Sequence, residues 1–164
     1  MEVLSLATER FRNLSDAVIE FGPRINVLFG DNAQGKTNLI EAIWLFSGAK
    51  SFRGSKENEM IAFGAETTSL TLHFRDNQRE QTAKIQFGGK EKKKVWLNKV
   101  PLESQRKFAG SFYAVVFAPT HLSIISEGPK NRRKFLDSAI SQINPQYADY
   151  LSRYEKVLQQ RNCL

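Results

Sequence analysis

An eight-residue segment with two glycines, a lysine and a threonine is the part of this sequence best suited to chemistry. It fills every position of the pattern G-x-x-x-x-G-K-[ST]. Backbone N–H groups bind phosphate oxygens where the chain curls tightly, which Gly30 and Gly35 permit because they lack a Cβ. Lys36 supplies a charge for β- and γ-phosphates, and the Thr37 hydroxyl supplies a ligand for Mg²⁺. The predicted site for ATP and Mg²⁺ consists of Gly30, Asp31, Asn32, Ala33, Gln34, Gly35, Lys36 and Thr37.

The segments on either side of this loop have the patterns that a phosphate-binding loop requires. Residues 25–29 read Ile-Asn-Val-Leu-Phe, which is typical of a strand buried on both faces. After the loop, Leu39, Ile40, Ile43 and Phe46 recur at helical spacing, and Gly48 is placed to end that helix. The sequence therefore predicts a strand, a glycine loop and a helix whose N-terminus points at the phosphates.

The rest of the chain predicts an α/β fold with a mixed sheet. Short strands are expected at 3–7 and 16–21, and an antiparallel β-meander is expected between Thr67 and Leu97. Residues 112–117 read as another buried strand. Gly128-Pro129 and Asn144-Pro145 are typical helix starts, and the apolar spacing after each of them predicts an amphipathic helix.

Charge is distributed unevenly along the 164 residues, whose net charge is +7. Residues 1–89 carry 10 basic and 11 acidic side chains, whereas residues 90–164 carry 14 basic and 6 acidic ones. Such an excess favours polyanions, DNA above all, and the densest run makes Lys92, Lys93 and Lys94 candidate DNA contacts. No apolar run approaches the length of a membrane helix and the single cysteine is Cys163, so we expect a cytoplasmic protein without a membrane segment.

Hydrolysis is not predicted from these residues. A P-loop ATPase also needs an acidic residue at the end of a second buried strand, and no apolar segment here runs convincingly into one. We therefore assign no catalytic residue. The chain stops within a helical pattern at Leu164, so we expect an N-terminal fragment of a longer protein.

Several segments together resemble the RecF family of bacterial recombination mediators, whose ATPase head is related to ABC and SMC heads. The resemblance runs in register along essentially the whole chain. It is carried by residues 11–13 (Phe-Arg-Asn), 26–43, 51–53 (Ser-Phe-Arg), 115–119, 128–129, 132–137 and 158–162. Asn38, directly after Gly-Lys-Thr, is typical of RecF and SMC-like heads.

This resemblance implies a head that is split in sequence. Residues 1–120 would form the P-loop lobe with its β-meander, and residues 121–164 would begin a helical arm. The missing acidic strand and the signature motif would follow later. The resemblance further implies that Arg12, Asn13, Asn38 and Arg53 lie near the nucleotide.

The family's role implies partners as well. Its members bind ATP, dimerise around two nucleotides, engage DNA at gaps, hydrolyse ATP slowly and load recombinase with RecO and RecR in repair and the SOS response. Two other functions stay open from the residues alone. One is a P-loop kinase acting on a small molecule, and the other is a non-catalytic DNA-binding module.

Overall fold

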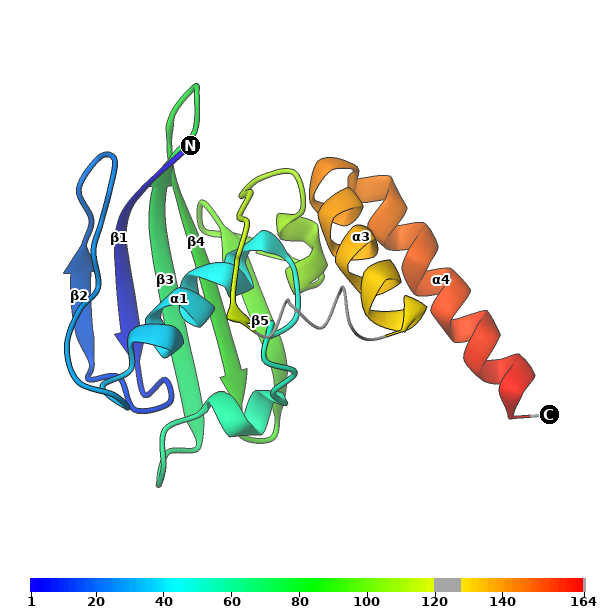
Figure 1. Cartoon of the computed structure of the whole chain (residues 1–164), viewed down its shortest axis with the longest axis horizontal. Helices are drawn as coiled ribbons and strands as arrows, with labels where there is room; N and C mark the ends of the chain where they lie inside the picture. Colours follow the sequence, from blue (N-terminus) through cyan, green and yellow to red (C-terminus); the bar gives the residue numbers. More distant parts are fainter. Residues whose placement is uncertain (120–127, 164) are drawn as a thin grey trace.

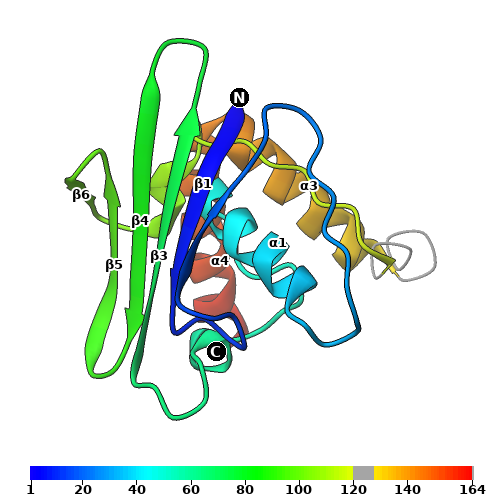
Figure 2. The same ribbon diagram turned by 90° about the vertical axis from the view of Figure 1, so that its left-hand side faces the viewer.

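Six antiparallel strands form one sheet, and the helices of the described part of the chain lie on one side of it (Figures 1 and 2). The computed structural model describes residues 1–119 and 128–163. Within that part of the chain the strand order is β2-β1-β3-β4-β5-β6. The strands are β1 (Glu2–Glu9), β2 (Ala17–Glu20), β3 (Thr67–Arg75), β4 (Glu80–Gly88), β5 (Glu91–Leu97) and β6 (Val100–Leu102).

The β-meander predicted between Thr67 and Leu97 is confirmed. Leu70, Leu72 and Phe74 alternate along β3 and are fully buried, so one face of this strand lies in the core. Leu70 pairs with Ile85 of β4, and Ile85 pairs with Val95 of β5. The period of two in the sequence therefore sets which face of the sheet is covered.

The helices confirm the predicted helix positions. The segment after the glycine loop is α1 (Lys36–Trp44), which continues into the short helix η1 (Leu45–Ser47). Gly48 ends η1 rather than α1, in a left-handed conformation with φ of 83°. The remaining helices are η2 (Glu57–Met60), η3 (Gln105–Phe108), α3 (Pro129–Ile143) and α4 (Pro145–Asn162).

Asn144 caps α4 as its sequence context predicted. Its Oδ1 accepts hydrogen bonds from the backbone N–H groups of Gln146 at 3.0 Å and Tyr147 at 3.3 Å. The chain turns at this cap, so α3 and α4 form an antiparallel hairpin beside the β5 end of the sheet (Figure 1).

The core lies between the sheet and α1. Leu39 and Ala42 of α1 and Phe46 of η1 share one buried cluster with the strand residues Leu6 and Leu72. Phe46 also packs on Phe108 of η3, with ring centroids 5.8 Å apart. This packing fixes the axis of α1 and with it the position of the glycine loop at its N-terminus.

Residues 25–29 are not a strand in this structure, so that prediction is wrong. Ile25, Val27 and Phe29 are 86%, 74% and 90% exposed, and the segment forms no ladder with the described strands. A β-strand forms only where a neighbouring strand pairs with its backbone N–H and C=O groups. The two edge strands of this sheet are β2 and β6, and residues 25–29 pair with neither of them.

The strand predicted at residues 112–117 is also wrong. One face of the segment is covered, because Phe112 packs edge-on against Phe74 with centroids 5.2 Å apart. Val115 on the opposite face is 94% exposed. The described sheet is consequently antiparallel throughout rather than mixed.

The expected domain boundary between residues 120 and 121 lies outside the described residues.

Candidate nucleotide site

The glycine loop has the tight curl that its sequence requires. Gly30, Ala33 and Gly35 all have positive φ, at 137°, 65° and 91°. A Cβ on Gly35 would lie 2.6 Å from Leu14 Cδ2 and 3.0 Å from Asn13 Oδ1, so a larger residue would displace these two side chains. A Cβ on Gly30 would meet nothing within 4 Å, which leaves that side of the loop open. Gly35 is therefore needed because a Cβ would clash there, and Gly30 is needed because its φ is unfavourable for a residue with a Cβ.

The two reactive side chains of the loop follow Gly35 directly. Lys36 is the first residue of α1, and its Nζ donates to the carbonyl oxygens of Gly30 at 2.8 Å and Asp31 at 2.6 Å. The lysine side chain thus spans the loop from its C-terminal to its N-terminal end. Thr37 is exposed beside it.

The N-terminus of α1 is suited to an anion. Its capping residue is Gly35, no side chain caps it, and its first turn contains no acidic residue. The first N–H groups of a helix lack partners within the helix, and the helix dipole places partial positive charge there. The loop and the helix therefore present donors and positive charge to the same place.

Three predicted site residues form a hydrogen-bonded chain that leads into the loop. Asn13 Nδ2 donates to the Ala33 carbonyl at 2.7 Å, and Asn13 Oδ1 accepts from Asn38 Nδ2 at 2.7 Å. Arg53 Nη1 donates to Asn38 Oδ1 at 2.8 Å. Asn13, Asn38 and Arg53 are thus brought together around α1, although they lie far apart in sequence.

Arg12 points to a different partner. Its Nε and Nη2 donate to the two carboxylate oxygens of Glu41, at 2.6 and 3.1 Å. Nη2 also donates to Ser55 Oγ at 2.7 Å, and Nη1 donates to the Glu59 carbonyl at 3.1 Å. In this structure the guanidinium joins α1 to residues 55–59 rather than to the glycine loop.

The backbone around Arg12 is shaped to place that side chain. Arg10 and Arg12 both have positive φ, at 52° and 50°, which is uncommon for residues with a Cβ. Between them Phe11 is fully buried and forms an isolated antiparallel bridge with Ile61. The buried Phe11 ring anchors the turn that contains both left-handed residues, and the Arg12 side chain leaves this turn toward Glu41 of α1.

Glu41 and Ser51 are residues of this site that sequence reasoning missed. The Glu41 carboxylate is fully buried and also accepts a hydrogen bond from Ser51 Oγ, and Arg53 Nη1 lies 4.0 Å from it. The sequence did contain a signal for Glu41, which is an acidic residue on the otherwise apolar face of α1, about one helical turn after Asn38. A buried acid needs partners, which predicts a basic residue nearby but does not say which one.

The lysine run 92–94 is divided between the two faces of β5. Lys92 and Lys94 are exposed, whereas Lys93 points inward and its side chain is only 17% exposed. Lys93 Nζ lies 2.6 Å from Glu57 Oε1, donates to Gln105 Oε1 at 2.7 Å and stands 4.9 Å from the centre of the Phe87 ring. Lys93 therefore joins β5 to η2 and η3.

The glycine loop, the helix that follows it and the antiparallel sheet define a P-loop nucleotide-binding head. A family model described as AAA domain matches residues 5–162, and the chain belongs to this family. No helix in the described part of the chain is long and apolar enough to cross a membrane.

Within this class the chain is similar to RecF. It is 40% identical over 162 residues to the DNA replication and repair protein RecF of Clostridioides difficile (strain 630) and covers 99% of itself and 43% of that protein. RecF of Thermoanaerobacter sp. (strain X514) is 42% identical over 166 residues, with 100% and 45% covered. The chain thus spans less than half the length of these curated relatives.

Solved structures give the same result. The structure of the recombination mediator RecF with ATP, from the RecFOR pathway, matches 99% of this chain and 44% of its own, with a TM-score of 0.93 and 37% identity. An SMC ATPase structure, described for ATP-driven dimerisation and DNA-stimulated activation, matches 84% of this chain with a TM-score of 0.64 and 18% identity. The second match shows a shared fold.

Proposed function

We propose that this chain is the ATP-binding part of a RecF-type DNA replication and repair protein, in which ATP controls dimerisation and DNA binding. The observation that carries this proposal is the glycine loop. Its positive-φ curl, the Lys36 side chain and the uncapped N-terminus of α1 form one anion site. The match to RecF with ATP over 99% of the chain supports ATP as the anion.

The residues present fit ATP with Mg²⁺. The backbone of residues 30–35 and the first turn of α1 would hold the phosphates, and Lys36 would balance the charge of the β- and γ-phosphates. Thr37 would contribute its hydroxyl to Mg²⁺. Asn13 acts on the loop itself, because it holds the Ala33 carbonyl. When bound, ATP supplies the charge and the phosphate surface that a second head can recognise.

The partners of this function follow from the relatives. We propose a homodimer on ATP binding, contact with DNA at gaps, and action with RecO and RecR, since the structural relative is described as part of the RecFOR pathway. Slow ATP hydrolysis is proposed for the whole protein. None of the described residues is assigned to it.

A Lys36→Ala variant of the full-length protein tests this proposal. Binding of ATP with Mg²⁺ is measured by calorimetry, and the dimer fraction is measured by sedimentation with and without ATP. We expect ATP affinity to fall at least about tenfold, equivalent to about 1.4 kcal/mol, and ATP-dependent dimerisation to be lost. Lys130→Ala, which removes an equal charge from exposed α3, should behave as the wild type. A Lys36→Ala protein that still dimerises with ATP would overturn the proposal.

A further inference from the structure

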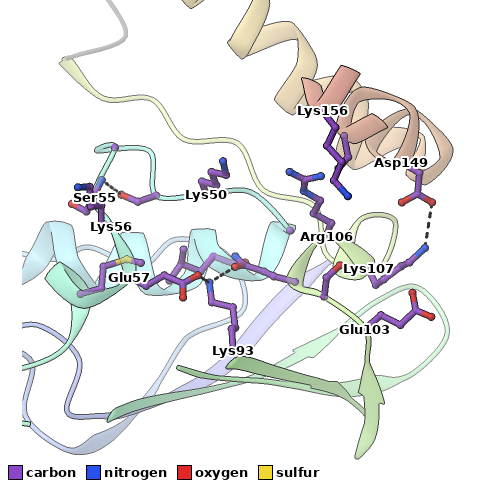
Figure 3. A pocket seen from close by; sticks show the side chains of 18 of the residues that line it. Lys50, Ser55, Lys56, Glu57, Lys93, Glu103, Arg106, Lys107, Asp149 and Lys156 are labelled. Atoms are coloured by element: carbon purple, nitrogen blue, oxygen red, sulfur yellow. Dashed lines mark hydrogen bonds and ion pairs between the residues drawn. The ribbon is translucent and has the colours of Figure 1, made fainter. Parts of the chain in front are cut away.

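A strongly basic groove lies between α4, η3 and the loop that leads from η1 to η2 (Figure 3). Its volume is about 940 Å³, and its lining includes seven basic and three acidic side chains. The charge excess of the second half of the sequence is thus partly gathered in one hollow. Charges of one sign that share a concave surface repel each other and attract a polyanion.

The walls of the groove are fixed by ordinary contacts. Gln105 of η3 donates through Nε2 to the carbonyls of Leu45 at 2.7 Å and Ala49 at 2.8 Å, which attaches η3 to the end of η1. On the other side, Lys107 Nζ lies 3.3 Å from Asp149 Oδ2 of α4. The walls of the groove are therefore connected, because η3 is bonded to the end of η1 on one side and to α4 on the other.

Part of the basic charge is already neutralised. Lys93 is paired with Glu57, Lys107 is paired with Asp149, and Arg106 Nη2 lies 3.9 Å from Glu155 of α4. Within the described residues, Lys50, Lys56, Arg153 and Lys156 form no ion pair. All four are exposed along the groove, so their charges face solvent in the hollow.

The free cations come from separate segments. Arg153 and Lys156 lie one turn apart on α4, on the same face as Asp149, whereas Lys50 lies on the facing loop. Figure 3 shows Arg106 of η3 and Lys156 of α4 extending into the same hollow. Because these cations come from both the loop and α4, an extended polyanion can contact more of them than a single phosphate can.

The lining favours a nucleic-acid backbone over its bases. None of the described residues that line the groove is aromatic, so the groove has no surface on which an unpaired base could stack. Lysine and arginine contacts to phosphate position a duplex without reading its sequence.

We propose that this groove binds the phosphodiester backbone of duplex DNA through Lys50, Arg153 and Lys156. The inference rests on the DNA binding proposed above, and it locates that binding away from the lysine run of β5. Two groove residues, Ser51 and Ser55, also belong to the hydrogen-bonded network of Glu41 and Arg12, so the groove and the network that holds α1 share one loop.

The test compares two triple variants of the full-length protein that remove the same number of charges. The groove variant is Lys50→Gln, Arg153→Gln and Lys156→Gln. The control is Lys90→Gln, Lys92→Gln and Lys94→Gln, at the β4–β5 turn and on β5. Affinity for a fluorescent duplex is measured with ATP over a series of salt concentrations, and single-stranded DNA of equal length serves as the second probe.

We expect the groove variant to bind the duplex at least about tenfold more weakly and to lower the slope of log affinity against log salt by about 2 to 3. The control variant should lose less than about threefold, and duplex sequence should have no effect. Affinity for a fluorescent ATP analogue and the melting temperature should match the wild type in both variants.

Three outcomes would overturn the inference: equal losses in the two variants, an unchanged groove variant, or a groove effect confined to single-stranded DNA. A wild-type protein that does not bind DNA at all would instead overturn the proposed function, so the two failures are distinguishable.

Discussion

Arg12 and Glu41 form a bidentate ion pair that joins the turn after β1 to α1. The carboxylate is fully buried, and the arginine side chain is only 13% exposed. Two N–H groups of the guanidinium meet the two oxygens of the carboxylate, at 2.6 and 3.1 Å. The pair holds α1, and with it the glycine loop, against residues 51–59.

Disrupting this pair should cost stability in a recognisable pattern. Arg12→Leu leaves a buried carboxylate without its cation, and we expect it to lower the free energy of unfolding by about 3 kcal/mol, as should Glu41→Leu. The double variant should lose less than the sum of the two by about 1 to 3 kcal/mol, because the uncompensated charge is gone. Urea unfolding of the four proteins measures this coupling, and strictly additive losses would show that the two residues act independently.

Gly35 should tolerate no side chain. Gly35→Ala places a Cβ 2.6 Å from Leu14 Cδ2 at a φ of 91°. We expect a loss of ATP affinity of at least about tenfold, since the left-handed conformation alone costs about 1 to 2 kcal/mol and the Leu14 and Asn13 side chains must also shift. Adding Leu14→Ala removes the clash but not the strained φ, so melting temperature should recover partly while ATP affinity stays low. Titration with a fluorescent ATP analogue checks the prediction, which wild-type binding by Gly35→Ala would contradict.

Asn13 should affect the site more than the fold. Asn13→Ala frees the Ala33 carbonyl and removes the acceptor of Asn38, which are contacts of 2.7 Å each. Because Asn13 is exposed, we expect little change in melting temperature but a fall in ATP affinity of about three- to tenfold, the size of one or two hydrogen bonds. Asn58→Ala, at an exposed position of η2, is the matched control. Equal ATP affinity in the two variants would refute the role of Asn13.

Asp76 should make the β3–β4 turn sensitive to acid. The backbone N–H groups of Arg79 and then Gln78 donate to its carboxylate and lower the pKa of Asp76. A lowered folded-state pKa stabilises the protein above the unfolded value of about 3.9, and this stabilisation is lost as pH falls through the folded pKa. The difference in melting temperature between wild type and Asp76→Ala should therefore be constant near about pH 6 and shrink below about pH 4. A difference that does not change with pH would contradict the assignment.

The sequence predicted local features of the fold well and failed at partners distant along the chain. The alternation of Leu70, Leu72 and Phe74 and the cap at Asn144 are local patterns, and both predictions are confirmed. The apolar run at 25–29 has the composition of a buried strand, yet a strand also needs a neighbouring strand, and its own residues do not specify one.

The same limit applies to the candidate site. The eight loop residues follow from a contiguous pattern, whose lysine and glycines are arranged as the pattern requires. Glu41, by contrast, contributes to the site by pairing with Arg12, which lies 29 residues earlier in the chain. Lys93, one of three adjacent lysines, is distinguished from its neighbours by the pleat of β5, which turns its side chain toward Glu57 and Gln105. Such long-range pairs become visible once the elements are packed.

The loop at residues 51–55 has a thermodynamic consequence. Ser51 and Ser55 line the basic groove and also hydrogen-bond to Glu41 and Arg12, which hold α1 in place. If a polyanion bound in the groove shifts this loop and thereby changes the affinity for ATP, linkage requires ATP to change the affinity for that polyanion by the same factor. One short segment would then couple the two ligands in both directions, so that removing ATP would undo whatever change in DNA affinity its binding had produced.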